Sequence, residues 1–423
     1  MQFKIQNPKF KIAIVGAGPS GASLAIRLAM ENFRVTLIER EKFPRHKLCG
    51  EFISPECLSH FQDLGVFDEM LASGGDRILE TVFYEPNGKS VGVPSKWFGG
   101  DSEGALSLSR AAMDFCLLEK AREIGVEVLE ETQAVGILSE NDEVCGVKIK
   151  SKNGETSEIF ADLTIDATGR ANVLSKLAEK EISRKSAKTQ GKTDYELRIT
   201  NYEKRKTIQN PKSKIQNRLV GFKTHLKNVD LARSVCEIYF FRGGYGGLSY
   251  VENGLANHCF LIKAEIVKEF NSDAEKIVRE VIFQNKRAYQ TLKNAVPVED
   301  WLAVSVDGFG QKELNPATNL FAVGDAGAFI DPFTGSGMLM AFESAEILAK
   351  VITENNATTE KIAEIYKVSH KRKFQKRLRV CSLLRSAAFI PNLAAAAISV
   401  LSLSRRARFG LARSTRQKIS DLT

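Results

Sequence analysis

Short strand-like runs recur along this chain, and in two regions they alternate with helical patterns. Residues 12–15 and 320–323 are wholly apolar, which is typical of strands buried on both faces of a parallel sheet. Strands of this type are expected at 12–15, 34–38, 126–129, 163–166 and 320–323. Helices are expected at 22–30, 111–124 and 338–352. The alternation predicts a doubly wound parallel sheet with helices packed on it.

A second pattern consists of strand-like segments that follow one another through turns. Pro86–Lys89 is typical of a tight turn and predicts a hairpin over residues 81–93. Gly243–Gly247 is expected to be a turn, and helices are expected over 55–71 and 272–285. These segments predict a small antiparallel meander and a larger antiparallel sheet with a helix across it. Their remaining strands are expected at 134–138, 144–150, 155–161, 219–226, 234–241, 248–251 and 257–263.

Together the patterns predict an α/β fold in three parts. A discontinuous, Rossmann-like nucleotide-binding domain carries an inserted α+β substrate domain built on an antiparallel sheet, and a C-terminal helical region follows. Between them lies a polar, lysine-rich stretch without periodicity, which is expected to be a disordered basic insertion. The boundaries are 11–75, 105–182 and 301–355 for the first domain, 76–104 and 218–300 for the second, 183–217 for the insertion and 356–423 for the C-terminal region.

Composition adds few constraints. The 423 residues are 43% hydrophobic and 26% charged, as in an ordinary globular protein of two or three structural units. Seven scattered cysteines without a CxxC pair, and five histidines without ligand spacing, predict reduced thiols and no metal site. The polar N-terminus predicts no signal peptide, and hence a cytoplasmic protein. The net charge of +9 lies partly in the insertion, which is expected to be a solvated linker and not a nucleic-acid site.

The loop after the first strand carries a G-x-G-x-x-G fingerprint. Gly16 permits a tight turn, Gly18 lets the backbone approach a pyrophosphate, and Gly21 lets the helix pack closely on the strand. Glu39 ends the next strand, where it can accept hydrogen bonds from a ribose 2′-hydroxyl and would repel a 2′-phosphate. The pattern predicts a dinucleotide site, whose residues here are Gly16, Gly18, Pro19, Ser20, Gly21, Glu39 and Arg40.

A second glycine-bearing corner follows the strand at 320–323. An aspartate at this strand end, Asp325, can accept hydrogen bonds from a polyol such as a ribityl chain. Residues 331–337 then begin a helix whose free N–H groups could stabilise negative charge on a reduced flavin. The residues assigned to this corner are Gly324, Asp325, Pro332, Gly335, Ser336 and Gly337.

Two segments between the corners complete the predicted site. Gly50 belongs to the loop 43–51, whose backbone could approach a flavin ring, while its basic residues could equally be solvated charges. Arg110 begins the helix at 111–124, where a cation opposes the helix dipole unless an anion such as a phosphate faces it. The alternative for Arg110 is a surface arginine. No side chain identifies itself as an acid or base, and Cys49 and Arg45 are the nearest candidates.

The C-terminal region is basic and apolar in turn. Residues 371–379 are basic and 380–403 mostly apolar, but Arg385 and Pro391 interrupt the apolar segment and argue against a single spanning helix. Apolar residues between basic flanks predict peripheral docking on an anionic membrane face through 371–408. A helical cap on the body or on a second subunit is the alternative. The oligomeric state is not indicated.

Three motifs occur in this order in one flavoprotein superfamily: the fingerprint, the helix start Ser109–Asp114 and the segment Gly324–Met338. The chain resembles the FAD-dependent oxidoreductases of the geranylgeranyl reductase and para-hydroxybenzoate hydroxylase type over most of residues 11–355. The resemblance implies FAD in the first domain, with Arg110 near the cofactor and the backbone of Val135 against its adenine.

The subfamily is marked less clearly. The segments Lys47–Gly50 and Asp166–Arg170 look more like prenyl reductases and flavin halogenases than simple phenol hydroxylases. The Y-x-W-x-F-P motif of the prenyl reductases is replaced by Tyr245–Tyr250, which has no Trp, Phe or Pro, and Trp97 and Trp301 stand outside any halogenase W-x-W-x-I-P signature.

The leading prediction is a monooxygenase that uses NAD(P)H and hydroxylates a lipophilic aromatic or polyketide-type substrate. The first alternative is FAD-dependent reduction of isoprenoid C=C bonds. An alternative of another class is a non-catalytic prenyl-protein binder of the escort type, which would carry no flavin.

Overall fold

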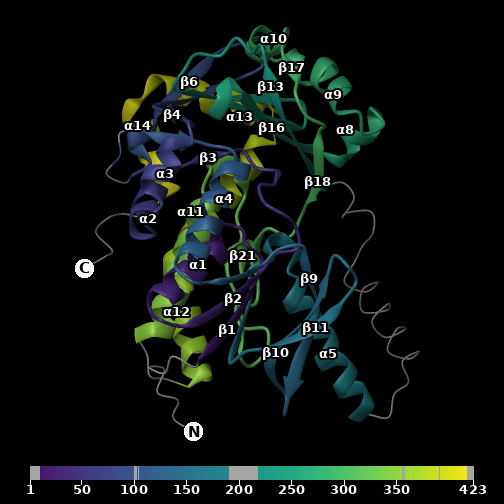
Figure 1. The fold of residues 1–423 in the computed structure, drawn as a ribbon. Helices are drawn as coiled ribbons and strands as arrows, with labels where there is room; N and C mark the ends of the chain where they lie inside the picture. Colours follow the sequence, from purple (N-terminus) through teal and green to yellow (C-terminus); the bar gives the residue numbers. More distant parts are fainter. Residues whose placement is uncertain are drawn as a thin grey trace.

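Five parallel strands form the sheet at the centre of the nucleotide-binding part (Figure 1). The computed structural model describes residues 10–99, 102, 104–189, 218–354, 358–389 and 391–416. Within these ranges the strand order is β20-β12-β1-β2-β8, with every neighbouring pair parallel, which confirms the predicted Rossmann-like parallel sheet. Its strands are β1 (Lys11–Val15), β2 (Arg34–Ile38), β8 (Glu127–Leu129), β12 (Leu163–Asp166) and β20 (Leu320–Ala322).

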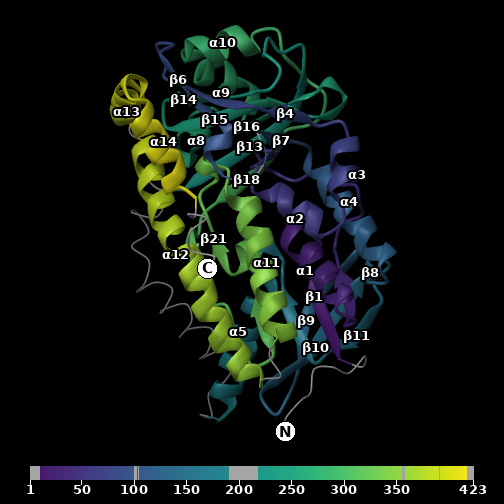
Figure 2. The same cartoon turned by 90° about the vertical axis from the view of Figure 1, so that its left-hand side faces the viewer.

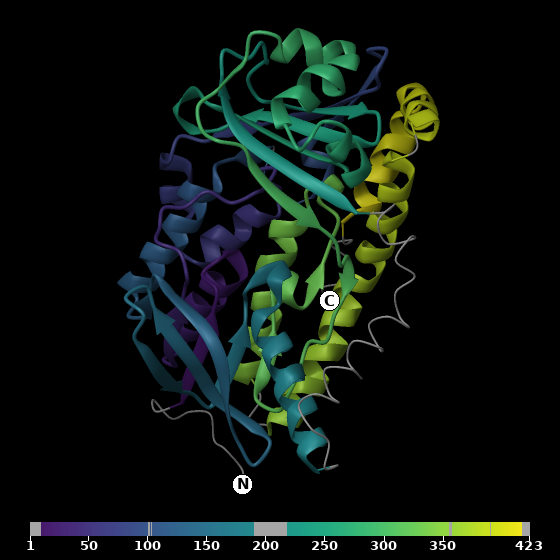
Figure 3. The ribbon, with the colours of Figure 1, turned by 90° about the vertical axis from the view of Figure 1, so that its right-hand side faces the viewer.

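Alternate residues of β1 face two different layers. Ile12 and Ile14 pack into a core with the helices on one face, whereas Ala13 and Val15 pack against the meander on the other. The helices are α1 (Pro19–Met30), α4 (Arg110–Glu123), α11 (Gly337–Glu354) and α12 (Thr359–Ala388), seen in Figure 2. The meander consists of β9 (Thr132–Glu140), β10 (Glu143–Ser151) and β11 (Thr156–Phe160), with α5 (Val173–Thr189) beside it, in blue and teal in Figure 3.

A larger, mostly antiparallel sheet lies above the carboxyl ends of the parallel strands (Figure 1). Its strand order is β17-β13-β16-β15-β14-β5-β6, and β18 also pairs with β13. Tyr239, Phe260 and Ile277 belong to the core between this sheet and the helices on its outer face. The strands are β5 (Glu80–Tyr84), β6 (Ser90–Pro94), β13 (Leu219–Lys227), β14 (Val235–Phe241), β15 (Gly244–Tyr250), β16 (Ala256–Lys263), β17 (Val296–Pro297) and β18 (Leu302–Val306). The helices are α8 (Ala264–Glu269), α9 (Ala274–Glu280) and α10 (Lys286–Leu292).

The structure corrects three local predictions. The helix expected over 55–71 is two helices, α2 (Cys57–Asp63) and α3 (Phe67–Ala72), because Gly65 between them has a left-handed φ of 65°. The expected turn at Gly243–Gly247 is mostly strand β15, and only Gly243 belongs to the turn. The helix expected over 272–285 ends as α9 at Glu280, and a short 3-10 turn follows it.

The close packing of β15 explains its glycines. A Cβ on Gly244 would lie 2.3 Å from the Leu261 carbonyl oxygen, and one on Gly246 would lie 2.7 Å from the Phe260 Cβ. Glycine is therefore required there by the neighbouring strand and not by a turn.

The boundary of the basic insertion also differs. Helix α5 continues to Thr189, past the expected start of the insertion at residue 183. The rest of that prediction, residues 190–217, lies outside the described residues, as does the leader up to residue 9.

Three helices form the C-terminal region. Helix α12 packs along α11, and after a break at Pro391 come α13 (Pro391–Leu403) and α14 (Arg405–Ser414), which reach β6 of the larger sheet (Figure 2). Among the described residues, no helix combines the length and the apolar character that crossing a membrane requires. Beyond α14, the Arg416 guanidinium donates to Ser336 Oγ at 2.8 Å and to the Thr334 carbonyl at 2.9 Å, so Arg416 joins the segment after α14 to the second glycine corner.

Candidate functional site

A cavity of about 1080 Å³ lies between the carboxyl ends of the parallel strands and the inner face of the larger sheet. It is lined by Val15 and Ile38 at the ends of β1 and β2, and by Asp325 just beyond β20. Strands of the larger sheet supply the opposite wall, with Phe240 and Tyr245 among its residues. In doubly wound proteins this edge of the sheet is where the ligand binds.

The fingerprint loop is held in shape by contacts that exclude side chains. Gly16 has a φ of 107°, and a Cβ on it would lie 2.4 Å from the Ala167 carbonyl oxygen. A Cβ on Gly21 would lie 1.8 Å from the Gly16 oxygen. At Gly18 the nearest atom to a Cβ would be the Arg110 guanidinium at 3.8 Å, so the backbone there is open toward the cavity. A loop of this form fits a pyrophosphate at the start of α1.

The two glycine corners meet. Gly324 has a φ of 59°, and a Cβ on it would lie 2.5 Å from Ser20 Oγ in the fingerprint loop. The Gly324 N–H donates to Ser344 Oγ of α11 at 2.9 Å, which fixes the corner against that helix. Segments more than 300 residues apart in the sequence thus form one end of the cavity.

Glu39 is buried beside the loop. Its carboxylate accepts hydrogen bonds from the Ala17 N–H at 2.9 Å and from the Glu41 N–H at 3.0 Å. The same carboxylate lines the cavity, and its remaining lone pairs can accept from the hydroxyl groups of a ribose.

Cations are concentrated on the nucleotide side of the cavity. Burial, together with Arg45 and Arg110, lowers the pKa of Lys47 to about 8. Burial would lower the pKa of Arg110 too, but Asp114, which accepts two hydrogen bonds from its guanidinium at 2.8 and 2.7 Å, raises that pKa above its ordinary value. Arg110 therefore lines the cavity as a permanent cation. An anionic ligand would reduce the electrostatic repulsion between Arg110 and the neighbouring positive side chains. The lining cations are Arg40, Arg45, Lys47, Arg110, Arg170, Lys176 and, on α14, Arg408.

Most predicted cofactor residues line this single cavity, and four do not. Gly21, Val135, Gly324 and Ser336 lie outside its lining, and the adjacent Thr132–Ala134 of β9 line it where Val135 was expected. The predicted residues in the lining are Gly16, Gly18, Pro19, Ser20, Glu39, Arg40, Gly50, Arg110, Asp325, Pro332, Gly335 and Gly337.

The wall formed by the larger sheet and the C-terminal helices is mainly apolar. Phe83 and Phe240 come from the sheet, and Ile398 and Leu401 come from α13. One polar pair is buried in this wall, since the Tyr245 hydroxyl donates to Asp331 Oδ1 at 3.0 Å. Burial and the neighbouring Asp331 raise the pKa of Tyr245 well above its ordinary value, so the phenol keeps its proton.

The two candidates for acid or base chemistry differ in their surroundings. The Cys49 sulfur lies in the lining, where it accepts a hydrogen bond from the Glu51 N–H at 3.4 Å. Arg45 forms an ion pair with Asp114 at 2.8 Å, and its guanidinium stacks over the Phe43 ring at 4.4 Å. Its positive charge is therefore already paired with a carboxylate. Cys49 has no ion pair of this kind with any described residue, so it is the better candidate of the two for acid or base chemistry.

A buried charged cluster at the edge of the cavity was not expected from the sequence. Glu51, which has no exposed surface, accepts hydrogen bonds from Lys223 Nζ at 2.5 Å and from the Arg110 N–H at 2.8 Å. His225 Nε2 lies 2.7 Å from its second oxygen. Burial would raise the pKa of Glu51, but His225 and Lys223 together lower it below 4.5. Glu51 is far in sequence from Lys223 and His225, so no local sequence pattern indicates that they are in contact.

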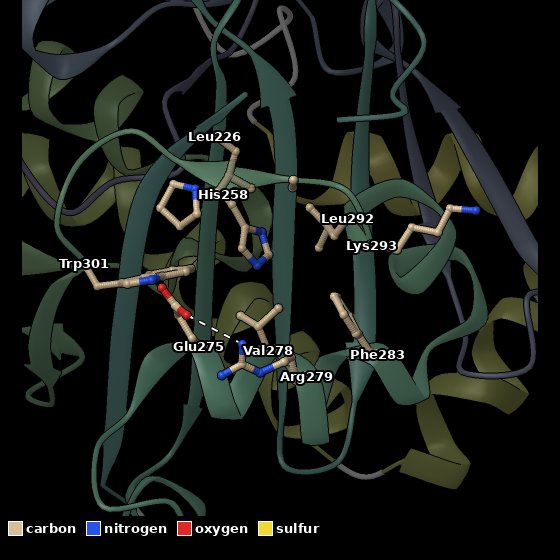
Figure 4. A pocket seen from close by; sticks show the side chains of 11 residues that line it. Leu226, His258, Glu275, Val278, Arg279, Phe283, Leu292, Lys293 and Trp301 are labelled. Atoms are coloured by element: carbon tan, nitrogen blue, oxygen red, sulfur yellow. Dashed lines mark ion pairs between the residues drawn. The ribbon is translucent and has the colours of Figure 1, made fainter. Parts of the chain in front are cut away.

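A second, smaller pocket of about 160 Å³ lies on the outer face of the larger sheet, under α9 (Figure 4). Its rim carries the ion pair of Glu275 with Arg279, 3.7 Å apart. His258 of β16 faces this pocket, and burial lowers its pKa to about 4, whereas the next residue, Cys259, faces the main cavity. The pocket and the main cavity share no lining residue. Residues of the glycine fingerprint line the main cavity, and none of them lines the smaller pocket.

The fold and the cavity define a Rossmann-type flavoprotein, and the comparisons agree. Residues 9–372 match the family described as FAD binding domain, and the chain belongs to that family. It is therefore an FAD-dependent oxidoreductase, and its family favours an enzyme over the escort-type binder.

Curated relatives include lipid reductases. The chain is 25% identical over 374 residues to the digeranylgeranylglycerophospholipid reductase of Methanosarcina acetivorans, covering 84% of this chain and 79% of that protein. It is 26% identical over 350 residues to digeranylgeranylglycerophospholipid reductase 2 of Methanopyrus kandleri, covering 82% and 77%.

Solved structures share the fold. A geranylgeranyl bacteriochlorophyll reductase-like protein of Thermoplasma acidophilum has a TM-score of 0.70 at 18% identity and covers 96% of both chains. The flavin-dependent brominase Bmp2 has a TM-score of 0.71 at 16% identity and covers 98% of this chain and 96% of its own. The same architecture is thus used for different flavin reactions.

Proposed function

We propose that this protein reduces carbon–carbon double bonds in the prenyl chains of a lipid. The observation that carries the proposal is the cavity, which continues from the nucleotide corner to an apolar wall of the larger sheet and α13. The named reductases, aligned over more than three quarters of their length, make reduction a better proposal than the hydroxylation favoured by the sequence patterns. FAD, when bound and reduced by a donor such as NAD(P)H, would supply the hydride.

In this proposal one wall of the cavity binds the cofactor and the other wall binds the substrate. The open backbone at Gly18 and the surrounding cations would hold the pyrophosphate, Glu39 the adenosine ribose and Asp325 the ribityl chain. Apolar side chains such as Phe240 would hold the prenyl chain and exclude water. Cys49 is our candidate for the group that gives a proton to the second carbon of the double bond.

One experiment separates reduction from hydroxylation. The purified flavoprotein is incubated without oxygen with dithionite and a digeranylgeranylglycerol phospholipid, and the lipid mass is followed. We expect a gain of two hydrogen atoms for each double bond reduced. Oxygen uptake with NAD(P)H and a phenolic lipid, giving a hydroxylated product while the prenyl lipid stays unchanged, would contradict the proposal and favour the monooxygenase. NAD(P)H is the proposed physiological donor and is tested in parallel.

A lipid substrate also motivates the proposed membrane contact of 371–408. Val400 and Leu403 of α13 are 62% and 89% exposed, and Arg405 and Arg406 follow directly. Apolar side chains beside arginines are typical of helices that rest on an anionic bilayer surface.

We expect the double variant Val400→Ser and Leu403→Ser to bind anionic vesicles at least about tenfold more weakly, since burying each of these side chains gives roughly 1.5–3 kcal/mol. Co-sedimentation with phosphatidylglycerol vesicles measures the effect. Val368→Ser is the matched control, because Val368 is 62% exposed on α12 outside the proposed surface. Equal binding by all three proteins would rule this surface out.

A further inference from the structure

Two histidines and a glutamate from distant parts of the chain meet beside the main cavity. His46 lies in the loop 43–51, His225 on β13 and Glu299 between β17 and β18. One ligand atom from each lies within 4.8 Å of the others. His225 Nδ1 is 2.9 Å from Glu299 Oε1, and His46 Nε2 is 3.3 Å from Glu299 Oε2.

We propose that His46, His225 and Glu299 bind one divalent transition metal ion, with Zn²⁺ as the best match. Zinc bonds to histidine nitrogen and carboxylate oxygen are about 2.0–2.2 Å long, so two ligand atoms of a tetrahedral site are about 3.3 Å apart. The two observed nitrogen–oxygen separations are close to this value. Three protein ligands of this kind leave a fourth position for water or another group.

The surroundings of His225 orient it as a ligand. Its Nε2 lies 2.7 Å from Glu51 Oε2, and Glu51 is in turn bound by Lys223 and by the Arg110 N–H. A carboxylate that accepts the N–H of one ring nitrogen leaves the lone pair of the other nitrogen free for a metal. Here that other nitrogen is Nδ1, which faces Glu299.

Glu299 supplies the second observation. Its Oε1 is buried and has no hydrogen-bond partner among the described residues, although it lies 2.9 Å from His225 Nδ1. A buried carboxylate oxygen without a hydrogen bond is costly, and a lone pair facing it from Nδ1 would add repulsion. A cation between the two atoms removes both costs.

The site is also accessible. The His46 side chain is 47% exposed and that of Glu299 is 23% exposed, and His46 also lines the main cavity. A bound ion would tie the loop 43–51 to the larger sheet, across the two walls that enclose the cavity. This inference does not depend on which reaction the flavin carries out.

The test uses the full-length flavoprotein after removal of metals by a chelator. Zinc is titrated against a competing fluorescent chelator, and the bound ion is examined by X-ray absorption. We expect one equivalent bound with a shell of nitrogen and oxygen at about 2.0–2.1 Å, without the sulfur distance of about 2.3 Å that any of the cysteines would give. His46→Ala and Glu299→Gln should each weaken zinc binding at least about tenfold.

Glu265→Gln is the control, because Glu265 is an exposed glutamate on α8. Circular dichroism and flavin content establish that each variant is folded. A sulfur shell, no stoichiometric binding, or binding unchanged in His46→Ala and Glu299→Gln would overturn the proposal and identify the cluster as an ion-pair network only.

Discussion

Replacing Asp325 by alanine is expected to remove most of the flavin from the purified protein while the fold persists. Asp325 lines the cavity, and we propose that it binds the ribityl chain. Loss of a charge-assisted hydrogen bond costs about 1.5–3 kcal/mol, so the dissociation constant for FAD should rise about 10- to 100-fold. The ratio of flavin to protein absorbance after gel filtration, and titration with added FAD, measure the change.

The electrostatics of the site sharpen this prediction. Burial raises the pKa of Asp325, although Arg170, Arg110 and two lysines oppose the shift. A carboxyl whose folded pKa is raised weakens the folded state as the pH rises through that pKa, so flavin-free Asp325→Ala should be at least as stable as the flavin-free parent at neutral pH. Asp325→Asn, which keeps an acceptor, should bind FAD with intermediate affinity. Full flavin content in Asp325→Ala would remove this residue from the proposed site.

The second large effect is expected at the buried pair of Glu51 and Lys223, neither of which is exposed. Glu51→Gln or Lys223→Met alone leaves one partner buried without its counter-charge, at a cost of about 3–5 kcal/mol in the free energy of unfolding. The double variant should recover much of that loss, because no unpaired charge then remains between these positions. Urea unfolding of the four proteins measures the coupling.

An exposed pair provides the control. Arg242 and Glu269, both about half exposed and 2.6 Å apart, should cost less than about 1 kcal/mol when either is removed. Losses of the same size at both pairs would contradict the argument from burial.

The same pair predicts a pH dependence. The folded pKa of Glu51 lies below its ordinary value of 4.5, so its ionised form stabilises the fold above that pH. This contribution is lost as the pH falls through the folded pKa. Glu51→Gln should therefore lose less stability than the parent between about pH 4.5 and lower values. Parallel acid unfolding curves for the two proteins would show that Glu51 does not contribute.

Several features of the fold could be predicted because local sequence suffices for them. The apolar runs at 12–15 and 320–323 have no polar face to expose, so each must be covered on both faces. Both form strands of the parallel sheet, β1 in its middle and β20 at its edge. Two fingerprint glycines are required within the turn itself, since Gly16 has a φ of 107° and a Cβ on Gly21 would lie 1.8 Å from the Gly16 oxygen. Pro391 is the first residue of α13, where its missing N–H costs no helical hydrogen bond, and α12 ends before it at Ala388.

Other features could not be predicted because they depend on contacts between distant segments. The glycines at 244–247 read as a turn, since nothing local reveals that β16 passes too closely for a side chain. The cluster around Glu51 joins the loop 43–51 to Lys223 and His225 of β13, 172 and 174 residues later. Arg416 binds Thr334 and Ser336 from a segment that the sequence assigned only to a C-terminal helical region.

The sequence by itself determined the parallel nucleotide-binding unit and its class of cofactor, because a buried strand, a glycine turn and a helix start are each encoded within a few adjacent residues. Only the tertiary structure decided how the two glycine corners meet at Ser20 and Gly324, which wall of the cavity is apolar, and that His46, His225 and Glu299 converge. Those arrangements arise from the packing of one sheet above another, and such packing depends on the whole chain and not on any one stretch of it.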